Sequence, residues 1–523
     1  MGRLILKNAR VRTLDPGLPE AWGVEIEDGI VTRVLPERAS HGRRAGDTAI
    51  ELHGLTLMPA FADAHVHLRT WAIARNAVDL GGTRDLGAAL GTLRAAAAGL
   101  PSGAWLRATR WNRNDWESPR WPDRTELDSA CSSAPALVES LDLHTCWLNS
   151  AALAAVGFGG DLTGRSIPEG LDVRREGPAL RASGIVREEL AFSMMRQAPP
   201  PPPAMFERRL REVCRWLCRK GVTAVSDMDG LEAAELLGSL ELPVRIRASV
   251  LARELEAAVR RGLRAGSKLG PRVKMGPLKL FLDGSLGSRT AWMLEPWEGE
   301  PTEAGTGSYE FKPLVELGER ALSSGWELAI HAIGDRANRQ VLDLYERLRP
   351  RYPEAVLRVE HAQLISERDL PRFAVAGALV SVQPSHLLDD VTSADKHWGC
   401  RARLAYPLGS LVRAGARLAF GSDVPVGDAD PRAGLDAALN RRDRSGLPPG
   451  GWYPGEKLTP QEALLAATAH AQEACGLANR AGRIAPGWLA DLIAVEGDPW
   501  STPPRDLQVR ATWIGGEPVH EKV

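Results

Sequence analysis

The feature that most constrains the fold of this chain is a series of eight short apolar segments, most of them separated by longer stretches with helical spacing of apolar residues. Several segments are nearly continuous apolar runs, which is typical of strands covered on both faces. Strands that alternate with helices indicate a parallel sheet, and eight such units indicate a (β/α)8 TIM-like barrel of the α/β class. The expected strands span residues 58–66, 222–228, 244–250, 276–284, 326–334, 356–364, 377–385 and 416–424.

The two ends of the chain have a different pattern, with short alternating segments joined by Asp28-Gly29 and Gly515-Gly516. These dipeptides are typical of tight turns between β-strands. We therefore expect one small β-sandwich domain built from both termini, residues 1–56 and 478–523.

The barrel is assigned to residues 57–84 and 206–477. The stretch between its first and second strands, residues 85–205, is too long for one helix and ends in five consecutive prolines, which form a stiff spacer. We interpret this stretch as a subdomain inserted after the first barrel strand, on the substrate side of the barrel mouth.

Composition narrows the classes of function. The chain has 523 residues, 44% of them apolar, and a formal net charge of -1, so no strong field attracts nucleic acid or an acidic membrane. No apolar run reaches the roughly 20 residues of a membrane helix, and the N-terminus lacks the apolar region of a secretory signal. The six cysteines have no framework spacing, which favours free thiols in a reducing compartment. We expect a cytoplasmic protein with a small-molecule substrate; a homodimer is allowed but not required.

Polar side chains cluster at the carboxyl ends of the predicted strands, which is the face where barrel enzymes carry their active sites. His65 and His67 are two residues apart, so a strand points both imidazoles to one side. Neutral imidazoles are ligands of divalent metals, with zinc the first choice and manganese, iron or nickel also compatible. The candidate ligands are His65, His67, Lys279, His331, His361 and Asp423. They could hold one ion or two.

Lys279 is the unusual member of this set, because a protonated lysine would be repelled by a dication. We expect it either to be buried and neutral or to have reacted with CO2 to give a carbamate that can bridge two metals. The competing interpretation is an ion pair with Asp283. Asp423 can bind metal and can also accept a proton from metal-bound water, whose pKa a dication lowers to about 7. The predicted chemistry is attack of metal-activated water on a carbonyl-like carbon, with Asp423 as the catalytic acid and base.

Several motifs in order along the chain resemble the amidohydrolase superfamily, and more narrowly its YtcJ-like branch (amidohydrolase family 3), which includes N-substituted formamide deformylases. They are FADAHVHL, LKLFLDGSLGSRTA, LAIHAIGDRAN, RVEHAQ, SVQPSH, FGSDVP and IAPGWLADLIAVEGDP. The resemblance implies a composite β-sandwich, a distorted barrel, the four histidines as metal ligands, a carboxylated Lys279 and a catalytic Asp423. It implies a metal-dependent hydrolase of carbon–nitrogen bonds other than peptide bonds.

Further residues are candidates for substrate binding. The segment PALVESLDLHTCWLNSAAL matches the same branch and suggests that Asp142, His144 and Asn149 line the substrate side, although the family usually has glycine where this chain has Leu143. Gln383 and His386 either contact substrate or pack behind it. Asp283 and Arg289 either hold the loop after the fourth strand or meet a substrate carboxylate. Trp111 and Trp116, with two neighbouring tryptophans, form either an apolar wall for substrate or the core of the insert. We expect a structural or surface role for His41, His53, His397, His470 and His520.

Two alternatives stay open. A metal-dependent deaminase of a cyclic amidine or nucleobase is the first, although related deaminases tend to have a glutamate near Asp335 and no lysine at the position of Lys279. The second is a non-catalytic scaffold that kept the fold and lost the metal, which would predict missing ligands, and none is missing.

Overall fold

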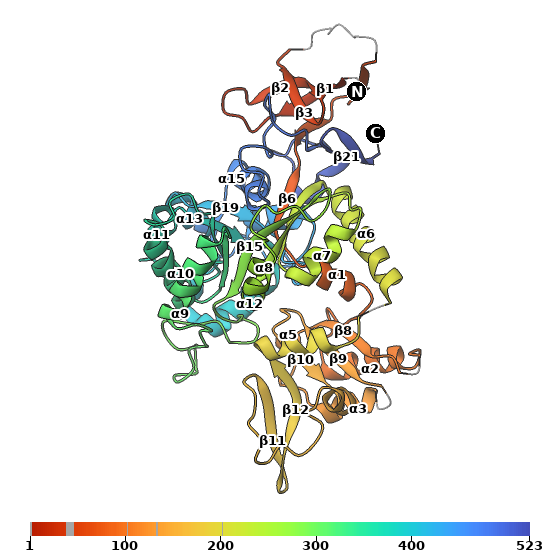
Figure 1. Ribbon diagram of the computed structural model, residues 1–523, viewed down its shortest axis with the longest axis vertical. Helices are drawn as coiled ribbons and strands as arrows, with labels where there is room; N and C mark the ends of the chain where they lie inside the picture. Colours follow the sequence, from red (N-terminus) through yellow and green to blue (C-terminus); the bar gives the residue numbers. More distant parts are fainter. Residues whose placement is uncertain (1–2, 38–45, 102, 132–133, 201, 523) are drawn as a thin grey trace.

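The computed structural model describes residues 3–37, 46–101, 103–131, 134–200 and 202–522; His41 lies outside the described residues. Its strands form three sheets: one from both ends of the chain, one parallel sheet of eight strands and one in the insert. In Figure 1 the parallel sheet and its helices lie between the terminal sheet above and the insert below.

The eight strands expected from the sequence are present and parallel, and they are hydrogen-bonded in chain order. They are β6 (Phe61–Val66), β13 (Val222–Asp227), β14 (Arg245–Leu251), β15 (Val273–Phe281), β16 (Leu328–Ala332), β17 (Leu357–His361), β18 (Leu379–Val382) and β19 (Arg417–Phe420). A parallel bridge between Val66 and Val424 joins the two outermost strands, so the sheet is a nearly closed barrel. The predicted α/β TIM-like barrel is confirmed.

Helices cover the barrel because each presents an apolar stripe to the strands. On α10 (Asp335–Leu348) the buried stripe includes Val341, Leu344, Tyr345 and Leu348, at the spacing of one helix face. The other helices of this region are α1 (Leu68–Ala74), α6 (Pro203–Arg219), α7 (Leu231–Ser239), α8 (Leu255–Arg260), α9 (Phe311–Ser323), α11 (Leu370–Val375), α12 (Leu387–Trp398), α13 (Leu408–Arg413), α14 (Pro431–Asn440), α15 (Pro460–Ala467) and α16 (Ala469–Ala474).

The terminal sheet joins strands from both ends of the chain in the order β22-β21-β20-β5-β1-β2-β3, with β4 on β1. Its strands are β1 (Leu4–Arg12), β2 (Glu20–Glu27), β3 (Ile30–Leu35), β4 (Thr48–Glu51), β5 (Thr56–Pro59), β20 (Leu492–Glu496), β21 (Gln508–Ile514) and β22 (Glu517–Glu521). The junction is the antiparallel pairing of Met58 with Ile493. Because β5 is followed within two residues by β6, this sheet holds the start of the first barrel strand.

The insert has its own sheet, in the order β11-β12-β10-β9-β8-β7. Its strands are β7 (Val78–Asp79), β8 (Leu106–Trp111), β9 (Ala136–Ser140), β10 (Thr145–Leu148), β11 (Leu171–Glu176) and β12 (Ala179–Arg187), and its helices are α2 (Leu86–Ala97), α3 (Arg124–Ala130), α4 (Ser150–Ala155) and α5 (Glu188–Gln197). The turn from β9 to β10, residues 141–144, contributes to the wall of a cavity shared with the barrel. In the described part of the chain, no helix combines the length and apolar character needed to cross a membrane.

Candidate metal centre and substrate cavity

The carboxyl ends of the barrel strands bring the predicted ligands together. His65 lies on β6, Lys279 on β15, His331 on β16 and His361 on β17. Asp423 follows β19, and its backbone N–H donates to the carbonyl oxygen of His65 at 2.7 Å, which fixes the loop beside β6. These residues are all buried. His67, which directly follows β6, is partly exposed.

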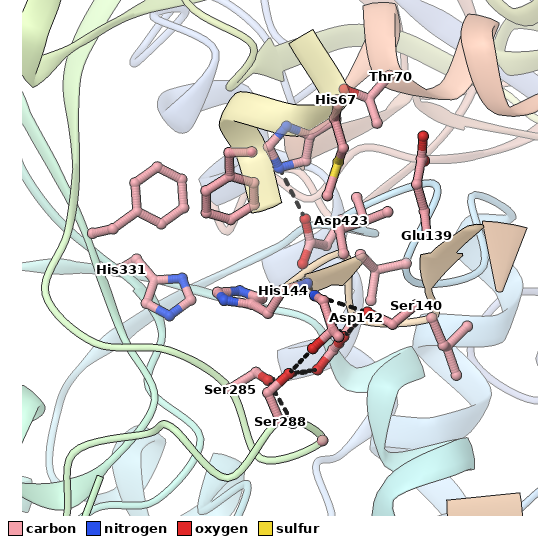
Figure 2. A pocket seen from close by; sticks show the side chains of 18 of the residues that line it. His67, Thr70, Glu139, Ser140, Asp142, His144, Ser285, Ser288, His331 and Asp423 are labelled. Carbon is pink, nitrogen blue, oxygen red and sulfur yellow. Dashed lines mark hydrogen bonds and ion pairs between the residues drawn. The ribbon is translucent and has the colours of Figure 1, made fainter. Parts of the chain in front are cut away.

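The donor atoms face a common centre. One nitrogen each of His65 and His361 and one oxygen of Asp423 lie within 4.8 Å of one another. Asp423 Oδ1 is 3.5 Å from His65 Nε2 and 3.3 Å from His67 Nε2, and Asp423 Oδ2 is 4.0 Å from His361 Nδ1. The ring of His361 is 4.5 Å from that of His331, centroid to centroid. Figure 2 shows His67 directed at Asp423.

Hydrogen bonds orient the imidazoles from behind. His65 Nδ1 lies 2.7 Å from Glu360 Oε2, and His67 Nδ1 lies 3.0 Å from Asp229 Oδ1. His331 Nε2 lies 3.0 Å from the carbonyl oxygen of Gly284. A ring nitrogen that donates to such an acceptor leaves the other nitrogen with its lone pair free, as a metal ligand requires.

Glu360 and Asp229 were missed by the sequence analysis. Each follows a signal that was available, since Glu360 directly precedes His361 on β17 and Asp229 lies two residues beyond β13. A carboxylate at a strand end next to a candidate ligand is a natural partner for the outer nitrogen of an imidazole. The pairing itself depends on which strands are neighbours.

Lys279 is almost completely buried, and its Nζ has no hydrogen-bond partner among the described residues. The nearest aromatic contact is the ring of Phe281, 4.7 Å away. Burial lowers the pKa of Lys279 to about 8, against the opposing charges of Glu360 and Asp423. Asp283 does not pair with it. The expected ion pair of Lys279 with a carboxylate is therefore absent among the described residues.

The electrostatics separate the histidines into two groups. Burial lowers the pKa of His65 to about 4 and holds that of His331 and of His361 well below the usual range, so these rings are neutral. Burial also acts on His67, but hydrogen bonds to Asp229 and Asp423 outweigh it and raise the pKa to about 10. Two buried carboxylates thus surround His67 with negative charge, which favours a cation at this position.

Two residues of the centre have a left-handed backbone that is uncommon outside glycine. The φ angle is 73° at His361 and 56° at Asp423. Such conformations cost about 1–3 kcal/mol each and persist where the surrounding structure imposes them. Both residues contribute side chains to the centre.

The centre opens into a cavity of about 230 Å³ that is walled by the barrel on one side and by the insert on the other. The insert contributes Asp142, whose carboxylate accepts hydrogen bonds from the hydroxyls of Ser140, Ser285 and Ser288 at 2.5, 2.6 and 2.9 Å (Figure 2). The two last serines belong to the loop after β15, so Asp142 ties the insert to the barrel. Leu143 takes the left-handed conformation, φ 61°, that glycine would adopt more readily at this turn.

His144 lies between the two halves of the cavity. Its ring is 5.5 Å from that of His331, and its Nδ1 lies 2.8 Å from Glu188 Oε2. Burial opposes protonation, but the charge of Glu188 outweighs it and raises the pKa of His144 to about 9. His144 is therefore an imidazolium at neutral pH and presents positive charge beside the neutral His331.

Of the other predicted substrate contacts, His386 and Trp111 line the cavity, and His386 Nε2 is 3.8 Å from Asp423 Oδ2. Trp116 and Gln383 are buried outside the cavity wall; Trp116 packs on Trp111, with 5.8 Å between the ring centroids. Trp111 belongs both to the cavity wall and to the core of the insert.

Three further candidates for substrate binding make contacts within the protein. Asn149 caps α4 through the N–H of Ala152, and its amide donates to the carbonyl oxygens of Cys131 and Ala134, so none of its polar atoms is free for substrate. Asp283 accepts from the backbone N–H groups of residues 292, 333 and 334 and so holds the loop after β15. Arg289 pairs with Glu300 outside the cavity wall.

With this geometry, comparison with known proteins is informative. A model of the amidohydrolase family matches residues 48–520. The chain belongs to the amidohydrolase family. It is 26% identical over 517 residues to the putative amidohydrolase YtcJ of Bacillus subtilis, covering 95% of this chain and 96% of that protein. It is 27% identical over 541 residues to the N-substituted formamide deformylase of Arthrobacter pascens, covering 99% and 98%.

A crystal structure of an uncharacterized metal-dependent hydrolase from Pyrococcus horikoshii is similar to this amidohydrolase over 97% of this chain and 99% of that one, with a TM-score of 0.76 and 25% identity. The resemblance to the YtcJ-like branch is confirmed. Family membership and these relatives support hydrolase activity and a divalent metal for this amidohydrolase.

Proposed function

We propose that this amidohydrolase cleaves an amide or a related carbon–nitrogen bond, other than a peptide bond, in a small-molecule substrate. The observation that carries the proposal is the convergence of His65, His361 and Asp423 within 4.8 Å, with the unpartnered Nζ of Lys279 buried near the same carboxylate. The deformylase among the relatives favours an amide substrate.

The donor set fits a divalent metal, with zinc the first candidate. The ligands would be His65, His67, His331, His361 and Asp423, together with Lys279 once its neutral amine has added CO2 and released a proton to give a carbamate. Imidazole and carboxylate donors suit zinc, and an anionic carbamate would balance the charge of a second ion. When bound, such a metal polarises a carbonyl oxygen and lowers the pKa of water.

Asp423 is proposed to move the proton. Its carboxylate lies among His65, His67 and His361 and faces the cavity, so it can accept a proton from the attacking water and deliver it to the departing nitrogen. Its Oδ1 faces His65 and His67, while Oδ2 is directed toward His361 and His386.

Residues of the insert are proposed to position the substrate. His144 presents an imidazolium beside His331, where it would hydrogen-bond to an oxygen of the scissile group. The aromatic and aliphatic wall, including Trp111, Phe192 and Phe281, excludes water from the rest of the substrate.

The test is to measure metal content per chain by elemental analysis on protein purified without chelator and without nickel affinity. The same protein is then assayed for hydrolysis of N-substituted formamides, N-acyl amino acids and, for the deaminase alternative, cyclic amidines. Bound metal and release of an amine from an amide would support the proposal. Absence of metal after supplementation would contradict it, and ammonia release from the amidines alone would assign a deaminase.

Peptide mass spectrometry under mild conditions adds a second readout. A peptide containing Lys279 with the added mass of CO2 would support the carbamate and a two-metal centre. An unmodified lysine with one metal per chain would leave a mononuclear hydrolase.

A further inference from the structure

Among the described residues, the arginines and the carboxylates of the cavity wall have partners, with one exception. Four arginines of the wall each contact a carboxylate: Arg69 with Glu232, Arg107 with Glu139, and Arg196 and Arg253 with Glu189. Other carboxylates of the wall, which do not pair with these arginines, also have partners. Asp229 pairs with His67, and Asp389 pairs with Arg444. Asp390 accepts a hydrogen bond from Tyr406, and Glu254 accepts from the N–H groups of Leu231 and Leu251.

The exception is Arg113, which lines the same cavity from the short turn after β8. Among the described residues its guanidinium has no ion pair and no hydrogen bond, and its Nη2 is inaccessible to solvent. A buried guanidinium nitrogen without an acceptor is costly, because its lost hydration is not replaced. An acceptor supplied by a ligand would remove that cost.

Arg113 is held in place by contacts that leave its donors free. Its guanidinium carbon lies 3.9 Å from the ring centroid of Trp121, which is cation–π stacking distance. The preceding residue, Asn112, fixes the turn by accepting from the N–H of Asn114 at 3.1 Å. A stacked guanidinium keeps its edge available for a planar bidentate partner.

Charges of both signs act on Arg113: Arg289 and Arg187 lower its pKa, whereas Asp142 and Glu300, the second of which pairs with Arg289, raise it. Arg187 lies 5.2 Å from the same ring of Trp121, and Arg289 is close enough for its charge to act on Arg113. Burial, then the charges of Arg289 and Arg187, lower the pKa of Arg113 to about 10, so it remains protonated at neutral pH. The nearby carboxylate of Asp142 does not neutralise it, because its oxygens already accept from three serine hydroxyls and from the N–H of His144.

We propose that Arg113 binds a carboxylate of the substrate at the insert end of the cavity, so that the substrate is an amide that also carries a free carboxylate. This inference rests on the proposed function for the position of the scissile bond. The carboxylate pairs with Arg113, which has no ion pair among the described residues, and the aromatic residues of the cavity wall cover the apolar part of the molecule. An N-acyl amino acid has this combination of groups.

The experiment compares matched ligands that differ in one charge. N-acetylphenylalanine and its carboxamide, with the phosphonate analogue as a third ligand, are titrated by calorimetry and tested as substrates. Wild-type enzyme is compared with Arg113→Gln, Arg113→Lys and the control Arg110→Gln. Arg110 lies on β8, just before the turn that carries Arg113, pairs with Asp79 and is outside the cavity wall.

We expect wild-type enzyme and the Arg110→Gln control to bind the carboxylate at least roughly tenfold more tightly than the carboxamide. Arg113→Gln should lose that preference, with the change in KM rather than kcat, and Arg113→Lys should restore part of it because the charge remains without the planar fork. Stronger binding of the phosphonate than of the carboxylate would assign the site to phosphoryl groups instead.

Equal binding of carboxylate and carboxamide by wild-type enzyme would overturn the proposal, as would an unchanged preference in Arg113→Gln or no binding of any carboxylate at millimolar concentration. The calorimetry separates this proposal from the catalytic one. A charge preference without hydrolysis supports the carboxylate site and counts against the proposed reaction, whereas hydrolysis without charge preference does the reverse.

Discussion

The barrel wall and the insert wall of the cavity differ in how their polar and charged groups are paired. At the barrel ends, polar atoms converge on a shared centre and several are left without partners, including Lys279 Nζ and His361 Nδ1. On the insert wall, the charged groups of the described residues are paired within the protein, except for Arg113. Unpartnered nitrogen atoms at the barrel ends are suited to bind a metal ion. A wall whose charges are paired except for one arginine is suited to select a ligand by its charge. In the proposed function, the barrel carries the chemistry and the insert carries the selectivity.

The largest effect should come from removing ligands on the barrel side. In His65→Ala and in His67→Ala, we expect loss of most of the bound metal and a fall in turnover of roughly a thousandfold or more, since the metal supplies several kcal/mol of transition-state stabilisation. Elemental analysis and steady-state assays measure both. His520→Ala, on strand β22 of the terminal sheet, is the control. Unchanged metal content in both ligand variants would remove them from the ligand set.

The next effect concerns proton transfer. Asp423→Asn should lower kcat by roughly 10²–10⁴-fold, because general acid–base catalysis contributes about that much, while the three neutral histidines retain part of the metal. A metal assay on the same sample separates loss of proton transfer from loss of the ion. Full activity in this variant would show that another group moves the proton.

Two buried carboxylates, one on each wall of the cavity, allow the two walls to be compared directly. Asp229 orients His67 on the barrel side, whereas Asp142 links the insert to the loop after β15. Asp229→Asn should weaken metal affinity roughly 10- to 100-fold, as loss of a carboxylate that orients a ligand usually does. Asp142→Asn should leave metal affinity unchanged and raise KM about tenfold through displacement of the insert. Competition with a chelator measures the first quantity, and the same shift in both variants would argue against two functionally distinct walls.

The smallest effect is on stability and comes from the ion pair of His144 with Glu188. The pKa of His144 is raised from 6.5 to about 9, so the stabilisation is fully present below about pH 6.5 and is lost as the pH rises through about 9. Since Glu188 is partly exposed, we expect only about 1 kcal/mol. Urea unfolding of wild-type protein and His144→Gln at about pH 6 and pH 9.5 should show a difference that shrinks at the higher pH. A difference that grows with pH would mean that His144 is neutral in the folded state.

Much of the barrel could be predicted because its pattern is local. A run such as residues 276–284 is mostly apolar, which is typical of a strand covered on both faces. The histidines at strand ends could be predicted for the same reason, since the end of a strand can be located in the sequence and all parallel strands end at one face.

The insert was less predictable because its roles depend on contacts between distant residues. Asn149 and Asp142 occur in the same sequence motif, yet Asn149 caps a helix while Asp142 meets serines more than 140 residues away. No periodicity distinguishes a polar side chain that holds backbone from one that faces a cavity. The partners Glu360 and Asp229 were missed for this reason as well.

The sequence by itself determined the order of strands and helices, the residue types at the strand ends and, through its motifs, the family. These follow from hydrophobic spacing and from motifs that are short in sequence. Only the tertiary structure decided which charges are neutralised and which are left free, because ion pairing depends on distances between segments that the fold brings together. Arg113 is one of many arginines in the sequence, and it becomes a candidate carboxylate site only because no carboxylate among the described residues forms an ion pair with it.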